Sequence, residues 1–450
     1  MDFLTGSPGP LYRRYLTASV GSALVVSIYS FVDTLAVGQS VGPLGSAAIA
    51  AINPIFGMMT FLAILCGIGG SVLMTNAKAR GRTEQGDAYF TASLLLAAIV
   101  TAVCWAALFI WNEPILRFFG ATDETLPYVK DYAIWIIRFF PLFILPNFLS
   151  AFIRNDGAPG LAMGAVISGG LLNVFGDWFL CFPMDMGMSG AAIATVSGTA
   201  LQCVIMSSHF FSKRCHLRIV KPYVLGKALG KILSLGFGSS VLDLGTVVLN
   251  VLINAQINRY GTLEALSVYG VVSTISCLFQ AIFCGVGQAI QPLVSANHGA
   301  KAPERVRAFL RYGLLTSAVM GLCFTLIGEL LPRQITALFV AATPEVLDAA
   351  PQVVRLYFPM FLFLGINITA TYYLQSVRRG RASLIVSILR SIVLSGALLL
   401  LLPAVLPAER ALSGVLLSLP VSELITMCVA MVLLKSAVRR DRINISKKQY

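Results

Sequence analysis

Residues 88–111 read AYFTASLLLAAIVTAVCWAALFIW, a run of 24 residues without a charged side chain. A helix that crosses the hydrocarbon core of a bilayer needs roughly 20 predominantly apolar residues at about 1.5 Å each. The run has no alternation of polar and apolar residues, which a strand of a membrane barrel would require. It therefore predicts a transmembrane helix.

Similar runs follow one another along the 450 residues, of which 57% are hydrophobic and 12% are charged, with a mean hydropathy of +0.81. An average soluble domain carries about 25% charged residues, so this composition excludes a soluble fold. We predict an all-α integral membrane protein with twelve transmembrane helices, expected at about 15–37, 46–76, 88–111, 130–152, 160–182, 189–211, 232–257, 264–296, 309–331, 351–376, 383–403 and 411–434.

The basic residues lie on one side of the predicted membrane. Alternate loops, counted from the N-terminus, hold 25 Lys and Arg residues, whereas the remaining loops hold 5. Under the positive-inside rule both termini are cytoplasmic, which requires an even number of spans. The net charge of +13 is thereby explained by topology and does not indicate nucleic-acid binding.

A polar stretch at 212–231 divides six expected spans from six others. We predict an N-terminal lobe at 1–211, a cytoplasmic linker at 212–231, a C-terminal lobe at 232–434 and a basic cytoplasmic tail at 435–450. Landmarks recur between the halves at a displacement of 218: Cys66-Gly67-Ile68-Gly69 and Cys284-Gly285-Val286-Gly287, Gly81 and Gly299, and Phe140-Pro141 and Phe358-Pro359. Gly42 and Gly261, Ile115 and Ile335, and Pro183 and Pro403 match at 219 or 220. Parallel repeats of this kind are typical of carriers that bind substrate at the repeat interface.

Sequence motifs for enzymatic chemistry are missing. No G-x-x-x-x-G-K-[ST] phosphate loop or H-E-x-x-H zinc motif occurs. The three histidines, His209, His216 and His298, are isolated near the expected cytoplasmic ends of helices, and the nine cysteines lack the paired spacing of a zinc site or a disulfide framework. We therefore expect no enzymatic activity and no cofactor.

Acidic residues inside expected spans are candidates for a functional site, because a charge at membrane depth is costly. Asp33 and Asp177 lie about four and five residues before the outer ends of their spans, which is roughly 6 to 8 Å below the outer boundary at the helical rise. Asn173 shares a helix face with Asp177, and Thr195 reaches a similar depth on the next span. Alternatively, Asp33 faces a wet vestibule and Asp177 only caps or hydrogen-bonds a neighbouring helix.

Other charged residues fall within or beside the expected spans. Arg390 and Glu423 are expected to pair, and Asp156 is interpreted as a turn residue. Arg138 and Arg355 are expected to hydrogen-bond backbone carbonyls.

Together, several motifs in a fixed order resemble those of the multidrug and toxic compound extrusion (MATE) family, in its prokaryotic multidrug branch. The resemblance extends along essentially the whole chain and rests on Tyr29-Ser30-Phe31-Val32-Asp33-Thr34, Arg154-Asn155-Asp156-Gly157-Ala158-Pro159, Asn173-x-x-x-Asp177, Gly187-Met188-Ser189-Gly190, Asn254-x-Gln256, Gly285-x-Gly287-x-x-x-Gln291-Pro292 and Asn297-His298-Gly299.

The resemblance implies two six-helix lobes around a central cavity, in the plasma (inner) membrane of a prokaryote. It implies export of organic cations or amphipathic drugs by a monomer, driven by inward flow of H⁺ or Na⁺. Asp33, Asn173, Asp177 and Thr195 become the expected cation-coupling site, with Na⁺ as a possible ligand. Candidates for substrate binding are Tyr29, Asn53, Asp243, Asn254, Gln256 and Gln280.

Two departures from the family pattern affect these expectations. The first span has no proline at Leu16-Thr17-Ala18-Ser19, where many members bend the helix. Members coupled through the second lobe carry acids in the seventh and tenth spans, and here Asp243 in the seventh span is the only one of these found; a local packing hydrogen bond explains it equally well. A flippase for a lipid-linked precursor, in the same superfamily, is the alternative function; acids rather than clustered arginines in the first lobe favour cationic cargo.

Overall fold

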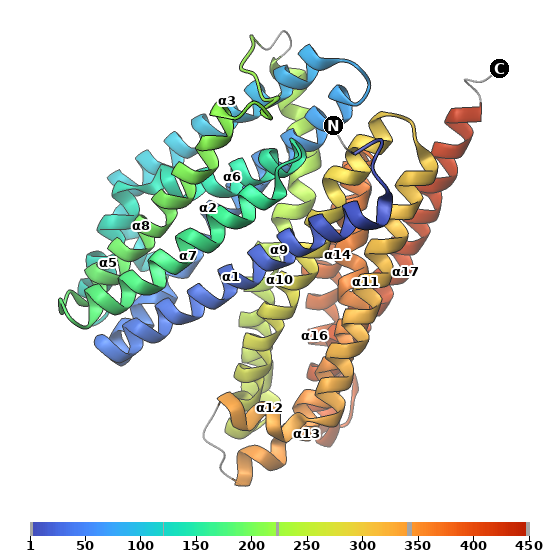
Figure 1. Cartoon of the computed structure of the whole chain (residues 1–450). Helices are drawn as coiled ribbons and strands as arrows, with labels where there is room; N and C mark the ends of the chain where they lie inside the picture. The colour runs from blue at the N-terminus through green and yellow to red at the C-terminus, as the bar shows by residue number, and fades with distance from the viewer. Residues whose placement is uncertain (1–2, 120, 222–224, 340–343, 447–450) are drawn as a thin grey trace. The chain divides into compact units, whose positions relative to one another are not determined.

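The computed structural model describes residues 3–119, 121–221, 225–339 and 344–446 (Figure 1). Within these residues all regular secondary structure is helical, which confirms the predicted all-α class. The helices of the first half are α1 (Pro8–Ser40), α2 (Pro43–Lys78), α3 (Thr83–Ile110), α4 (Asn112–Phe118), α5 (Leu126–Arg138), α6 (Phe140–Asn155), α7 (Pro159–Cys181), α8 (Gly187–Ser207) and the 3₁₀ helix η1 (Ser208–Phe211).

The second half repeats this order with more interruptions. Its elements are α9 (Leu225–Tyr260), α10 (Leu263–Gly299), α11 (Pro303–Leu330), α12 (Pro332–Phe339), α13 (Pro344–Tyr357), η2 (Phe358–Met360), α14 (Phe361–Ser376), α15 (Gly380–Ile388), the π-helical η3 (Leu389–Val393), α16 (Leu394–Val405), η4 (Ala408–Arg410) and α17 (Ala411–Ser446).

The chain forms two compact units, one made of residues 1–6 and 17–236 and the other of residues 7–16 and 237–450. In the first unit α7 packs against α8, and α2 packs against α3 and α6. In the second unit α10 and α11 pack against α14, and α17 packs against α16 and α14. The segment 212–221 of the expected linker has no helix, whereas α9 already begins at Leu225.

Ten helical segments within the described residues are long and apolar enough to cross a membrane. An eleventh candidate is the pair α5 and α6. Together these helices are long and apolar enough to cross a membrane, but they meet at an angle of 58°. Helix α9 carries the seventh expected span, and several of its side chains lie outside the described residues. The described part of the chain is thus a bundle of transmembrane helices.

Matching prolines mark the fourth and tenth expected spans. Pro141 lies in the first turn of α6, directly after the bend, and Pro359 lies in η2, between α13 and α14. Proline has no N–H to donate, and it disfavours the helical conformation at the preceding residue. Both repeats therefore interrupt the helix at the landmark Phe-Pro.

Candidate cation-binding site

The first unit brings α7 and α8 into close contact through glycines. A Cβ atom built on Gly198 would lie 2.5 Å from the carbonyl oxygen of Gly169 and 3.0 Å from Asn173 Cβ. One built on Gly176 would lie 2.8 Å from Ala194 Cβ. Since small residues permit such an approach between membrane helices, the polar side chains beside them come within hydrogen-bonding reach.

Four polar side chains from three helices form a connected group at this contact. On α7, Asn173 Nδ2 donates to Thr195 Oγ1 on α8 at 3.3 Å and, more weakly, to Asp177 Oδ1 at 3.5 Å. Thr195 Oγ1 in turn lies 3.3 Å from Asp33 Oδ1 on α1, to which it donates. Asp33, Asp177 and Thr195, expected at a similar depth, and Asn173, expected on the helix face of Asp177, thus lie together in the structure.

Both acids lack a basic partner among the described residues, where no ion pair joins Asp33 or Asp177 to a lysine, arginine or histidine. Asp177 is fully buried, and its Oδ2 has no hydrogen-bond partner. Asn173 is also buried, and its Oδ1 is likewise without a hydrogen bond. Carboxylate and amide oxygens are ligands suited to a hard cation, and a carboxylate also accepts a proton.

Tyr132 is a member of this group that the sequence analysis did not identify. Its hydroxyl lies 3.3 Å from Thr195 Oγ1, and the residue is 1% exposed. It comes from the middle of α5, the helix that meets α6 at the bend. A tyrosine in an apolar run has no distinguishing sequence signal, so only the fold shows that its hydroxyl faces the acids.

The second unit contains a different polar cluster, centred on an ion pair. Arg390 Nε lies 2.6 Å from Glu423 Oε1, and the two side chains are 7% and 6% exposed. Asn367 Nδ2 donates to Glu423 Oε2 at 2.7 Å, and Arg390 donates from its second terminal nitrogen to Gln280 Oε1 at 3.3 Å. The expected pairing of Arg390 with Glu423 is confirmed.

Arg390 lies in the π-helical turn η3, which separates α15 from α16. Single π-helical turns within α-helices are frequent at functional sites. The ion pair borders a cavity within this unit, whose lining comprises Leu249, Ile253, Ser273, Ser276, Cys277, Gln280, Tyr357, Met360, Arg390, Ser391, Ser395, Leu419 and Glu423.

The remaining sequence candidates are dispersed. Tyr29 packs against α7, where a Cβ built on Gly170 would lie 3.0 Å from its ring. Gln280 borders the cavity of the second unit. Asn53 and Asn254 are exposed, Gln256 is half-buried, and the side chain of Asp243 lies outside the described residues.

The two arginines expected to bind backbone carbonyls differ from each other. Arg355 Nε donates to the carbonyl oxygen of Glu329 at 3.1 Å, which agrees with that expectation. The guanidinium of Arg138 lies over the ring of Trp135, 5.6 Å from its centre, which is a cation–π contact.

Comparison with known proteins gives matches over nearly the whole length. The profile of the MatE family matches residues 18–179 and 243–401. The multidrug export protein MepA of Staphylococcus saprophyticus is 24% identical over 436 residues, which cover 96% of this chain and 93% of that protein. MepA of Staphylococcus aureus strain MW2 is 22% identical over 444 residues, covering 96% of this chain and 94% of that protein.

Solved structures share the fold at lower identity. An outward-facing multidrug resistance MATE family transporter of the MOP superfamily superposes with a TM-score of 0.89 at 20% identity, covering 98% of each chain. A MOP superfamily transporter from Pyrococcus furiosus, described as having a binding pocket of reverse polarity, gives 0.89 at 19% identity with the same coverage. The fold they share has twelve helices in two lobes.

Proposed function

The chain belongs to the MATE family of membrane transporters, and from that membership we propose that it exports organic cations or amphipathic drugs against an inward flow of H⁺ or Na⁺. It is a multi-pass membrane protein and not an enzyme. The export of drugs is proposed by analogy with the curated relatives named MepA. The nature of the coupling ion rests on the chemistry of the first unit.

The observation that carries the proposal is the pair of acids Asp33 and Asp177, joined through Thr195 and Asn173 and without a basic partner among the described residues. Two carboxylates in a poorly solvated site do not both remain charged cheaply. A proton or Na⁺ that enters from the outer side neutralises the pair. We therefore propose Asp33, Asn173, Asp177 and Thr195 as the coupling site.

Antiport follows if the ion and the drug favour different states of the helices around this site. A ligand shifts a conformational equilibrium only by its differential affinity for the two states. In the ion-bound state the acids are neutral and favour release of a cationic cargo. In the ion-free state their negative charge favours a cationic cargo, to whose binding we propose that Tyr29, Asn53, Asp243, Asn254, Gln256 and Gln280 contribute.

A transport assay with separated gradients tests the proposal. The purified chain is reconstituted into liposomes, and movement of a fluorescent organic cation is followed with a proton gradient, a sodium gradient or neither. We expect one gradient to drive accumulation in the parent, and Asp177→Asn to abolish it. Asp123→Asn, which changes an exposed acid with 89% side-chain exposure, is the matched control and should transport like the parent. Equal cation movement with and without gradients would refute coupled export.

The alternative of a lipid-precursor flippase requires basic residues free to bind a diphosphate. The buried arginine of the second unit, Arg390, is already paired with Glu423 at 2.6 Å, which favours cationic cargo over a diphosphate. Reconstituted vesicles with a labelled lipid diphosphate would distinguish the two functions. Gradient-independent movement of that lipid, with no movement of organic cations, would favour the flippase.

Both termini are proposed to be cytoplasmic, on the division of basic residues into 25 and 5 between alternate loops. Reporters fused at Tyr450 and inserted near Gln39 should report opposite sides of the membrane. Labelling on the same side would refute this topology. We further propose that the two units are the functional lobes of one monomer, which analytical ultracentrifugation in detergent would test.

A further inference from the structure

A second cluster of titratable side chains lies in the first unit, away from the coupling site. Asp156 ends α6, His209 lies in η1 after α8, and Cys215 and His216 follow in the segment 212–221. One ligand atom from each of Asp156, His209 and Cys215 lies within 4.8 Å of the other two. Two helix ends and the segment after the sixth span thus meet at one point.

Burial makes this cluster unusual for polar residues in a connecting segment. The side chains of Asp156 and His209 are 0% and 2% exposed, and His209 Nε2 lies 2.8 Å from Asp156 Oδ2. The other carboxylate oxygen, Oδ1, is buried without a hydrogen bond. His216 Nδ1 lies 3.4 Å from this oxygen, and the His216 side chain is 56% exposed. The cluster therefore holds a buried, unsatisfied acceptor and has one ligand open to solvent.

The turn that presents Asp156 is set by local sequence. Gly157 has φ of 95°, a conformation that glycine adopts without strain, so the chain reverses directly after α6. The same carboxylate oxygen that contacts His209 also accepts the backbone N–H of His216 at 2.8 Å. Asp156 therefore fixes both η1 and the following segment.

We propose that Asp156, His209 and Cys215, with His216 as the fourth ligand, form a binding site for a zinc-like divalent metal ion. One carboxylate, one thiolate and two neutral imidazoles sum to a charge of −2, which balances a divalent cation. Sulfur and imidazole ligands select zinc or another late transition metal over calcium or magnesium. In a tetrahedral zinc site with metal–ligand bonds of about 2.0–2.3 Å, ligand atoms lie about 3.3–3.8 Å apart, so small side-chain rotations close the cluster.

The positive charge of the nearby Lys78 is compensated, because Lys78 is paired with Asp87 at 2.6 Å and both side chains are 5% exposed. Burial raises the pKa of the Cys215 thiol, and the charge of Asp156 raises it further. The thiol is therefore protonated without metal, and binding replaces the S–H bond with an S–metal bond and releases the proton to solvent.

The proposed role of the metal is to fasten the segment 212–221 to the first unit. Besides the His216 N–H bond to Asp156, two contacts hold this segment: Lys78 Nζ donates to the carbonyl oxygen of His216, and the Val220 N–H donates to Thr91 Oγ1 at 3.0 Å. A metal ion that joins Asp156 and His209 to Cys215 adds a further, stronger link. Because binding requires the folded arrangement, the metal stabilises that arrangement.

Metal analysis of the full chain in detergent is the first test. Zinc content is measured by mass spectrometry after removal of loosely bound ions, and Co²⁺ replaces zinc as a spectroscopic probe. We expect one metal ion per chain and the charge-transfer absorption of a thiolate–Co²⁺ bond. Cys215→Ser should remove that absorption and weaken metal binding by about 100-fold or more, since even changes outside the first ligand shell cost 10–100-fold. His216→Ala should also weaken binding.

A matched cysteine control keeps the test specific. Cys428→Ser changes an exposed cysteine in the other unit and should leave Co²⁺ absorption unchanged. If the parent binds no stoichiometric metal, or if Cys215→Ser and Cys428→Ser bind Co²⁺ alike, the metal site is refuted. These outcomes do not depend on transport, so they also stand apart from the proposed export function.

Limited proteolysis gives a second readout of the same proposal. Trypsin can cleave after Lys213, Arg214 and Arg218, which lie on either side of the proposed ligands Cys215 and His216. We expect zinc to slow cleavage at these sites in the parent but not in Cys215→Ser, with cleavage after Arg439 as the internal reference. If zinc protected both proteins equally from cleavage, that result would contradict the proposed metal site.

Discussion

The two units of this transporter each bury acidic side chains among polar neighbours, but they balance the negative charge differently. In the first unit the neighbours of Asp33 and Asp177 are an amide and hydroxyl groups, and no ion pair to either acid is found in the described residues. In the second unit Glu423 is neutralised by Arg390 and also accepts from Asn367. The acids of the first unit can therefore bind an external cation, whereas the acid of the second unit is already neutralised by an arginine of the protein.

The difference assigns the units separate physical tasks. Acids without a fixed positive partner change protonation or bind a cation, which suits an ion-coupling site. A buried ion pair with additional hydrogen bonds is satisfied within the protein, and removing one partner leaves an uncompensated charge. We infer that the first unit couples transport to the ion, and that the pair in the second unit maintains the shape of the cavity beside it.

The largest effect is expected from the acids of the first unit. Asp33→Asn or Asp177→Asn should reduce gradient-driven efflux in proteoliposomes to the level of empty vesicles, because one neutral side chain mimics the protonated state permanently. The double mutant should be no worse than either single mutant, since both acids serve one site. Parent-like transport by both single mutants, or partial losses in them that add in the double mutant as for independent sites, would require abandoning the shared site.

The next effect tests the second unit through stability rather than transport. Arg390→Met should destabilise the protein by about 3–5 kcal/mol, because Glu423 would remain buried without its partner. Combining it with Glu423→Gln should recover much of that loss. Thermal unfolding of the two single variants and the double variant in detergent, read by intrinsic fluorescence, measures this coupling. If the double mutant were as unstable as the sum of the single changes, the pair would not act as a unit.

A smaller effect is expected at Thr195, which links the acids but carries no charge. Thr195→Ala should lower efflux by about fivefold, since a net hydrogen bond contributes about 1 kcal/mol. Thr195→Ser keeps the hydroxyl and should restore most of the activity. If Thr195→Ala lost all transport while Asp33→Asn kept full activity, the roles would be reversed: Thr195 would be essential for transport and the Asp33 carboxylate would not.

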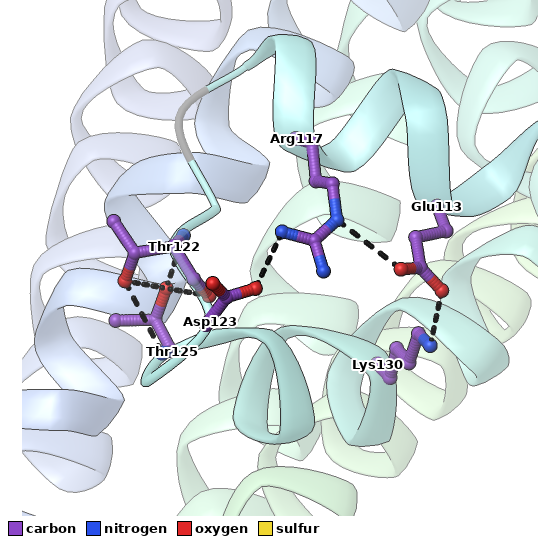
Figure 2. A network of polar contacts seen from close by, with 6 residues as sticks. All are labelled: Glu113, Arg117, Thr122, Asp123, Thr125 and Lys130. Carbon is purple, nitrogen blue, oxygen red and sulfur yellow. Dashed lines mark hydrogen bonds and ion pairs between the residues drawn. The ribbon is translucent and has the colours of Figure 1, made fainter.

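The smallest effect concerns exposed ion pairs at equivalent places in the two repeats. Figure 2 shows the contacts of Glu113 of α4 with Arg117 and Lys130. The ion pair of Glu113 with Lys130 has a distance of 2.6 Å. The corresponding pair, Arg333 with Asp348 at 2.9 Å, joins α12 to α13 with the charges reversed. Such pairs contribute little because water and salt screen them, so Glu113→Gln should leave thermal stability and transport nearly unchanged.

The pH dependence of that small contribution has a defined sign. The hydrogen bonds from Lys130 and Arg117 lower the pKa of Glu113. A lowered pKa in the folded state contributes stability above the ordinary carboxyl range, and this contribution is lost as pH falls through the lowered value. Melting curves of the parent and Glu113→Gln should therefore converge in acid. A difference that grows in acid would contradict this assignment.

Much of the fold follows from the sequence, because the physical constraints on membrane helices are strong. Apolar runs such as 88–111 satisfy their backbone hydrogen bonds only as helices in lipid, and the structure has α3 at Thr83–Ile110. The recurring Phe-Pro motif also predicted that Phe140-Pro141 and Phe358-Pro359 occupy equivalent positions in the two repeats. In the structure, the helix is interrupted at both positions. The depth of Asp33 and Asp177 follows from the rise per residue, so their common level was predictable.

What the sequence by itself determined is therefore the class of the protein, the internal repeat and the identity of the acids. Tertiary packing decided which groups surround them: Tyr132 joins Thr195 from α5, and Asp156 meets His209 across 53 residues of sequence. The rise of a helix fixes the depth of a side chain, but its neighbours depend on how helices pack around it. Glycine contacts, the angle of 58° between α5 and α6 and the path of residues 212–221 set that packing. A Phe-Pro motif indicates where the helix is interrupted, but no local motif encodes the size of the angle or the partners of the glycines.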